Sequence, residues 1–224
     1  KPDGLADLEL LAKAICDDTA LVSVMAANNE TGVLQPIAEI AAMCREHGAW
    51  FHTDAAQGFG KIPLDVGAQN IDLLSISGHK VYGPKGIGAL FVRRRPRIRL
   101  EPLFFGGGQE RGIRSGTLPA PLCIGLGVAA AVAAADMESD GERLAALRDR
   151  FLSRIRASLP DVQVNGSMHR RLPHNLNLTF PGVDAQELLV AVPDLALSTG
   201  SACSSAAVEP SFVLAARGLS DGAA

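Results

Sequence analysis

Apolar residues recur along this chain in two alternating patterns, one with the period of a helix and one typical of a buried strand. The leucines of residues 5–15 repeat at helical spacing, which predicts a first helix. A second helix is predicted over residues 36–47, with Pro36 in its first turn. Short apolar runs predict strands over residues 20–26, 50–53, 71–77 and 86–92. Strands that alternate with helices favour an α/β layer with a mainly parallel sheet.

The second half of the sequence has a different organisation. Its predicted elements are a long helix over residues 121–159 with a candidate break at 139–141, strands over 162–165 and 175–180, and a helix over 185–192. We therefore expect the C-terminal part of a large domain over residues 1–132. A small α+β domain is expected over residues 133–224, incomplete at its C-terminus.

Composition and charge narrow the classes of partner. The 224 residues carry a net charge of −3, which gives no global basic field for nucleic acid. The apolar run over residues 120–135 is shorter than the roughly 20 residues that span a membrane. The arginine-rich run over residues 93–99 could contact nucleic acid, but a solvated or subunit-facing edge suits the acidic total better. We expect neither direct nucleic-acid binding nor a membrane span.

The four cysteines are scattered, with no spacing typical of a zinc site or a disulfide framework. This usage fits a reducing cytoplasm, and no metal site is predicted. Cys16, Cys44 and Cys123 fall in helical patterns and are expected to be packing groups. Cys203 lies in a small, polar loop, where its thiol is expected to be accessible.

Polar residues directly follow three of the predicted strands. They are Asn28 and Asn29, then Asp54, then the run Ser77–Lys80. Functional residues of parallel sheets gather at the carboxyl ends of the strands. The three clusters are therefore expected at one edge of the sheet.

The residue types at this edge suit pyridoxal phosphate. Asp54 can pair with a protonated ring nitrogen, which makes the ring a better electron sink. Gln57 can donate a hydrogen bond to the ring's phenolic oxygen. Lys80 can form an imine with the cofactor's aldehyde once its amine is neutral. Ser77 and His79 carry donors that suit a phosphate.

Each of these residues also has a simpler interpretation. An isolated Asp after a strand, such as Asp54, is commonly a turn or cap residue. A lone histidine such as His79 is commonly structural or exposed. Lys85 is a rival to Lys80, although its Pro-Lys-Gly turn suggests that it is solvated. An exposed thiol such as Cys203 is commonly incidental, and beside a pyridoxal site it becomes a candidate nucleophile.

Five short motifs together resemble one family, the NifS/IscS-type cysteine desulfurases, which are class V aminotransferase-like pyridoxal phosphate enzymes. In chain order the motifs are Asn28–Gly32, His52–Gln57, Ser77–Gly86, Arg114–Thr117 and Ser201–Ser205. The resemblance covers essentially the whole chain. It implies a fold-type I pyridoxal-phosphate-dependent transferase and sulfurtransferase chemistry.

The resemblance also implies roles for individual residues. Lys80 would hold the cofactor and move protons, Asp54 and Gln57 would bind its ring, and Ser77 and His79 would bind its phosphate.

Asn29 would lie near the cofactor and the substrate carboxylate, and Thr117 would reach the phosphate in the partner subunit of a homodimer. Cys203 would take sulfur from L-cysteine as a persulfide, leaving L-alanine. An iron–sulfur scaffold or a tRNA-thiolation protein would then accept the sulfur.

The family's members are longer, so the resemblance implies a chain truncated at both ends. A Gly-Thr phosphate turn, a ring-stacking histidine and a carboxylate-binding arginine would lie outside it. Three other functions remain open from the sequence: selenocysteine lyase or cystathionine-type cleavage on the same scaffold, and a non-catalytic fragment for dimerisation or scaffold binding.

Overall fold

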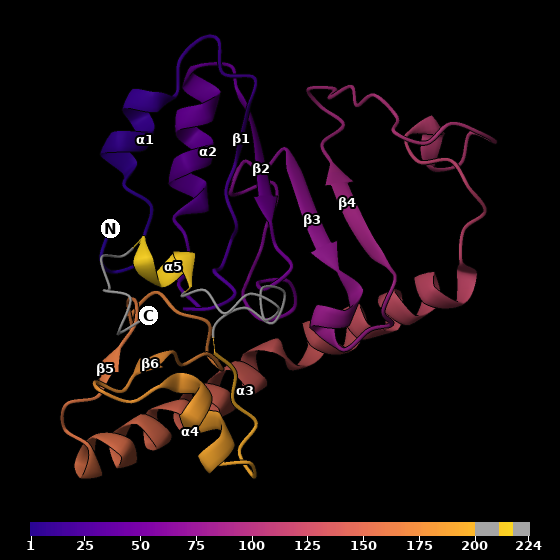
Figure 1. The fold of residues 1–224 in the computed structure, drawn as a ribbon. Coiled ribbons are helices and arrows are strands. Elements are labelled where there is room, and N and C mark those ends of the chain that lie inside the picture. The colour runs from indigo at the N-terminus through magenta and orange to yellow at the C-terminus, as the bar shows by residue number, and fades with distance from the viewer. Residues whose placement is uncertain (200–210, 217–224) are drawn as a thin grey trace. The chain divides into compact units, whose positions relative to one another are not determined.

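The computed structural model describes residues 1–199 and 211–216 (Figure 1). The chain divides into two compact units. Unit 1 combines Lys1–Leu11, Ala27–Pro36 and the chain from Ser139 onward, and unit 2 combines Ala12–Ala26 with Ile37–Glu138. The domain boundary predicted between residues 132 and 133 lies inside a long helix, as does the division between the units at Glu138 and Ser139. The domain assignment itself stays a prediction.

Unit 2 is built on a four-stranded sheet in the order β1-β2-β3-β4. The strands are β1 (Leu21–Ser23), β2 (Trp50–Asp54), β3 (Leu73–Ser77) and β4 (Gly88–Val92). β1 and β3 both run parallel to β2, and β4 closes the sheet antiparallel to β3 (Figure 1). The prediction of an α/β fold with a mainly parallel sheet is therefore confirmed.

Helix α2 (Ile37–Glu46) covers one face of this sheet. Its buried side chains are Ile37, Ile40, Ala41 and Cys44. On β2, Phe51 and Thr53 are both fully buried. Because side chains alternate along a strand, His52 and Asp54 point to the opposite face. The apolar packing of α2 thus fixes the face on which the polar residues of β2 appear.

Short helices complete unit 2. The 3₁₀ helix η1 (Gly78–Val81) follows β3 directly, and a second 3₁₀ helix, η2 (Glu110–Gly112), lies in the loop after β4.

Helix α1 (Leu8–Ala14) begins in unit 1, where the Asp7 carboxylate accepts hydrogen bonds from the amides of Glu9 (3.1 Å) and Leu10 (3.3 Å). This cap satisfies amides that have no partner within the helix.

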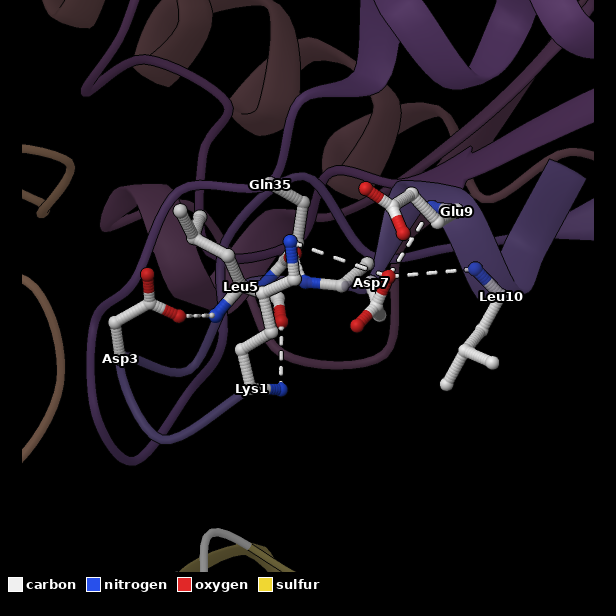
Figure 2. A network of polar contacts seen from close by, with 8 residues as sticks. Lys1, Asp3, Leu5, Asp7, Glu9, Leu10 and Gln35 are labelled. Atoms are coloured by element: carbon white, nitrogen blue, oxygen red, sulfur yellow. Dashed lines mark hydrogen bonds and ion pairs between the residues drawn. The ribbon is translucent and has the colours of Figure 1, made fainter.

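The N-terminal turn of unit 1 is held by side-chain to backbone contacts, which Figure 2 shows. Gln35 accepts from the amide of Ala6 and donates to the carbonyl of Gly4, both at 2.8 Å. The Asp3 carboxylate accepts from the amide of Leu5 at 3.0 Å. One glutamine therefore ties the segment before α1 to the segment around residue 35.

The rest of unit 1 carries the small α+β elements that the sequence predicts. β5 (Gln163–Val164) pairs antiparallel with β6 (Leu178–Thr179), and α4 (Ala185–Ala191) and α5 (Phe212–Ala215) follow. The Glu30 carboxylate is buried and accepts a hydrogen bond from the hydroxyl of Ser211. The Glu30 carbonyl accepts from the side-chain amides of Asn175 (3.1 Å) and Asn177 (3.3 Å).

Helix α3 (Ala120–Ser158) is continuous, so the break predicted at residues 139–141 is wrong. A lone glycine costs a helix only about 1 kcal/mol, which Gly141's helix-forming neighbours can outweigh. Asp140 and Arg143 also form an ion pair of 2.6 Å across this point. By length and composition alone α3 could cross a membrane, since an 18-residue stretch has a mean hydropathy of 1.8 and none of it is buried. One such helix is weak evidence for a span.

Candidate functional site

Two of the predicted polar clusters lie at neighbouring strand ends in unit 2. Asp54 is the last residue of β2 and is aligned with Ser75 of the parallel neighbour β3. Ser77 ends β3, and His79 and Lys80 follow in η1. The side chains of Asp54, Ser77 and Lys80 therefore leave the sheet at the same edge.

A tight turn follows Asp54 and carries Gln57. The Asp54 carboxylate accepts a hydrogen bond from the amide of Ala56 at 2.8 Å through one oxygen. The carbonyl of Ala55 accepts from Gly58 (3.0 Å) and Phe59 (2.7 Å), which closes the turn. Gln57 is half-buried, whereas Asp54 is exposed. The second oxygen of Asp54 takes part in no hydrogen bond among the described residues, so it can accept from a protonated heterocycle.

Close packing fixes the backbone at the start of η1. The amide of Gly78 donates to the carbonyl of Ile87 at 2.8 Å. A Cβ at Gly78 would lie 2.8 Å from the side chain of Ile87 and 3.0 Å from the carbonyl of Pro84, so only glycine fits. Ser77 Oγ and His79 Nδ1 are 3.0 Å apart, and Lys80 is half-buried beside them. The cluster presents one amine and two polar groups on a short, rigid element.

His52 lies behind Asp54 on the same face of the sheet. Its Nδ1 is 2.7 Å from the hydroxyl of Ser23 on β1, and its Nε2 is 3.1 Å from the hydroxyl of Ser75 on β3. Burial lowers the pKa of His52, and the negative charge of Asp54 acts in the opposite direction. The lowered pKa favours a neutral ring, which links three strands behind the Asp54 carboxylate.

Sequence reasoning gave no role to His52 or to Lys61, which lies in the turn after Gln57. For His52 a signal existed, because a residue two positions before Asp54 shares its face of the strand. For Lys61 the pattern gave none, since its surroundings are created by tertiary packing.

The described structure does not test the roles predicted for three further site residues. Asn29 is exposed and belongs to unit 1. Thr117 is exposed in the loop between η2 and α3. Cys203 lies outside the described residues. Their roles stay predictions.

The other three cysteines do not all behave as predicted. Cys44 is buried under the sheet, whereas Cys16 and Cys123 are exposed, so the packing role expected for those two is wrong. Hydrogen bonds, chiefly from the side chain of Thr19, lower the pKa of the Cys16 thiol. The helical pattern placed Cys16 and Cys123 near helices correctly but could not tell which face of each helix is covered.

The residues at the strand ends fit pyridoxal phosphate by their chemistry. A carboxylate with one oxygen that accepts from none of the described residues, a half-buried amine and a hydroxyl–imidazole pair are the groups that its ring nitrogen, aldehyde and phosphate require. Asp54 and Gln57 come from one strand end, and Ser77, His79 and Lys80 come from the next. Two adjacent parallel strands can therefore supply both the groups that bind the ring and the groups that bind the phosphate and the aldehyde.

Comparison with known proteins gives a consistent result. A model of the aminotransferase class-V family matches residues 1–217. The chain is 58% identical over 221 residues to cysteine desulfurase IscS of Rickettsia africae (strain ESF-5), a match that covers 99% of this chain and 54% of that protein. IscS of Rickettsia typhi is 56% identical over the same share of each chain. The chain thus spans about half the length of the curated relatives it matches.

Solved structures also match the fold of this chain. The X-ray structure of a NifS-like protein from Rickettsia africae ESF-5 matches with a TM-score of 0.87 and 33% identity, over 100% of this chain and 60% of that one. DndA from Streptomyces lividans matches with a TM-score of 0.85 and 44% identity, over 99% and 63%. These neighbours confirm the predicted fold-type I architecture and the resemblance to NifS/IscS-type proteins. Because the family match extends over almost the whole chain and includes every strand of the sheet, this chain belongs to the class V aminotransferase family.

Proposed function

We propose that the protein to which this chain belongs is a pyridoxal-phosphate-dependent cysteine desulfurase, a sulfurtransferase that converts L-cysteine to L-alanine. The observation that carries the proposal is the convergence of Asp54 and Lys80 at neighbouring ends of β2 and β3. The names of the relatives support it, since those 58% and 56% identical are called cysteine desulfurase IscS. Membership of a pyridoxal-phosphate-dependent family supports the cofactor.

The residues at the strand ends have separate tasks in this proposal. Pyridoxal phosphate, when bound, supplies an electron sink for the substrate carbon. Lys80 holds the cofactor covalently and transfers protons through its amine. Asp54 keeps the ring nitrogen protonated, and Gln57 donates to the phenolic oxygen. Ser77 and His79 bind the phosphate, to which Thr117 of a second copy also contributes.

Sulfur transfer falls to Cys203. Its thiolate attacks the sulfur atom of the bound cysteine, so an S–S bond forms while the Cβ–S bond breaks. The electron pair stays with the substrate carbon, which takes up a proton and leaves as alanine. Cys203 is left as a persulfide, whose outer sulfur passes to an acceptor such as an iron–sulfur scaffold or a tRNA-thiolation protein. Asn29 orients the substrate carboxylate.

The proposed assembly is a homodimer in the cytoplasm. Helix α3 supports the homodimer, because its apolar residues Ile124, Val128 and Val132 are each more than half exposed and repeat every fourth position. A stripe of this kind is typical of a covered interface. We assign the apolar stretch of α3 to subunit contact rather than to a membrane span.

Borohydride trapping tests the cofactor lysine. The full-length protein is loaded with pyridoxal phosphate, reduced, digested and mapped by mass spectrometry. The label is expected on Lys80, and Lys85, which is exposed in the next turn, serves as the internal control. A label on Lys85, or none on either lysine, would overturn the assignment.

Replacing Cys203 tests the sulfur-transfer step. We expect Cys203→Ser to keep the visible absorbance of the bound cofactor and to lose sulfide release from cysteine in the presence of a thiol reductant. Full sulfide release by this variant would reject the persulfide step. Running selenocysteine beside cysteine tells a desulfurase from a selenocysteine lyase on the same scaffold.

A further inference from the structure

His52 lies at the middle of a chain of hydrogen bonds that crosses three strands of the sheet. Its Nδ1 is 2.7 Å from the hydroxyl of Ser23 on β1, and its Nε2 is 3.1 Å from the hydroxyl of Ser75 on β3. A neutral imidazole donates from one ring nitrogen and accepts at the other, and a serine hydroxyl can do either. Both contacts can therefore be made at once, and the ring is held from two sides.

The contact with Ser75 crosses from β2 to β3 at a slant. In the parallel register His52 is aligned with Leu73, whereas Ser75 is aligned with Asp54. The imidazole therefore reaches past its own partner toward the carboxyl ends of the strands. Ser75 precedes Ser77 by two positions, so these two serines share one face of β3. The contact thus lies in the layer of side chains directly behind the strand ends.

The same two strand ends carry the groups on which the proposed cofactor site depends. Asp54 ends β2, and Lys80 lies in η1, which follows β3 directly. Each of them is expected to bind a different atom of one rigid ring, so the separation of the two strand ends has to be held to within about 0.5 Å. The contact of His52 with Ser75 is a side-chain hydrogen bond that joins these two strands.

The charge state of His52 suits this place behind a carboxylate. Burial lowers the pKa of His52, and the negative charge of Asp54 acts against that shift without cancelling it. A neutral ring forms no ion pair with Asp54. The negative charge of the carboxylate therefore stays available to a ligand that lies beyond the strand end.

We propose that His52 is a positioning residue for the cofactor site. By joining β2 to β3 through Ser75, it sets the separation between Asp54 and the segment that carries Lys80, and Ser23 fixes the plane of its ring. This role rests on the proposed function, because Asp54 and Lys80 are the groups that would hold pyridoxal phosphate. His52 acts through them and has no chemical step of its own.

Two amide substitutions separate the two contacts of the ring in the full-length protein. The amide of His52→Asn lies near the place of Nδ1 and can still meet Ser23, whereas that of His52→Gln reaches the place of Nε2 and can still meet Ser75. We expect the dissociation constant of pyridoxal phosphate, measured by absorbance titration, to rise about tenfold in His52→Asn. It should stay within about twofold in His52→Gln. His47→Gln, just before the other end of β2, is the matched control and should change nothing.

The ring nitrogen of the bound cofactor reports on Asp54 directly. Its NMR resonance, measured with isotope-labelled pyridoxal phosphate, should move toward that of an unprotonated ring in His52→Asn. The reason is that a displaced carboxylate holds the ring proton less well. His52→Gln should restore the resonance. A loss of stability alone would leave the resonance of the folded, loaded protein in place.

Three results would overturn the proposal. Equal affinity and an equal resonance in His52→Asn and the unchanged protein would show that the contact with Ser75 sets nothing at the site. Equal weakening by both amides would assign the effect to packing of the ring. If His52→Asn does not fold, Ser75→Ala removes the same contact from β3, and unchanged cofactor binding by that variant would be the third.

A failure of this proposal can be told from a failure of the proposed function. An unchanged protein that binds cofactor and is labelled at Lys80 by borohydride, beside His52 variants that bind it equally well, would contradict only the role of His52. An unchanged protein that binds no cofactor would contradict both.

Discussion

The hydroxyl of Thr53 is fully buried in β2, and in the described structure it has no hydrogen-bond partner. Burying a hydroxyl that has no hydrogen-bond partner costs free energy, because the hydroxyl loses its hydration. Thr53→Val keeps the shape of the side chain and removes this cost. We therefore expect the variant to raise the free energy of unfolding by about 1 kcal/mol, measured by urea denaturation.

Thr31 provides the matched control for Thr53. It is equally buried, but its hydroxyl donates to the Asn28 side chain at 3.1 Å. Thr31→Val should therefore lower the free energy of unfolding by about 1 kcal/mol. If Thr53→Val destabilised the protein as much as Thr31→Val, the hydroxyl of Thr53 would have to have a partner.

The chemistry of individual residues was more predictable than their surroundings. Asp54 and Lys80 could be placed from sequence, because each directly follows an apolar run and strand ends share an edge. Lys61 could not, because its burial depends on the contact between Gly60 and Val81, two residues that lie far apart in the sequence. Local patterns report alternation along one segment and carry no information about which segments touch.

At the scale of elements, two of the three glycines of α3 have very different surroundings. A Cβ at Gly141 would meet nothing within 4 Å, whereas one at Gly125 would lie 2.5 Å from the ring of Pro84. Gly141→Ala should therefore stabilise the helix by about 1 kcal/mol, because alanine loses less backbone entropy. The increase should appear as a higher urea midpoint.

Gly125→Ala is the control within the same helix. The rigid proline ring cannot rotate away, so this variant should be destabilised by about 1–3 kcal/mol. Stabilisation by both substitutions would contradict the packing of α3 on the turn after η1. No gain from Gly141→Ala would mean that the helix is interrupted near this residue.

Most elements of the fold follow from the sequence. The strands over residues 50–54 and 73–77 were placed within a few residues, since their short length favours a buried strand over a helix. The continuity of α3 was missed, because Ser139, Asp140 and Gly141 are each typical of a helix end. The exposure of Ser139 and Asp140 and the ion pair from Asp140 to Arg143 let the helix continue.

At the scale of the whole molecule, the exposed stripe of α3 predicts association. Val128 is 58% exposed at the centre of the stripe, so Val128→Asp should place a charge in the proposed dimer interface. Sedimentation of the full-length protein should give a dimer for the unchanged chain and a shift toward monomer for the variant.

Val190 on α4 is the matched control for the dimer prediction. It is 80% exposed and lies outside the stripe, so Val190→Asp should leave the sedimentation coefficient unchanged. A Val128→Asp protein that stays dimeric would place the subunit contact elsewhere. A monomer for the unchanged chain at every concentration would rule out the homodimer.

The antiparallel pairing of β4 with β3 has a consequence for cleavage of the chain. The segment with Lys80 and Lys85 leaves the sheet from β3 and returns at once to β4, and five residue pairs align the two strands. Lys85 is exposed in this connection and is a site for trypsin. A cut there would separate the chain into two pieces that the strand pairing still holds together. Measurements of the size of the native protein would not detect the cut, which would appear only after denaturation.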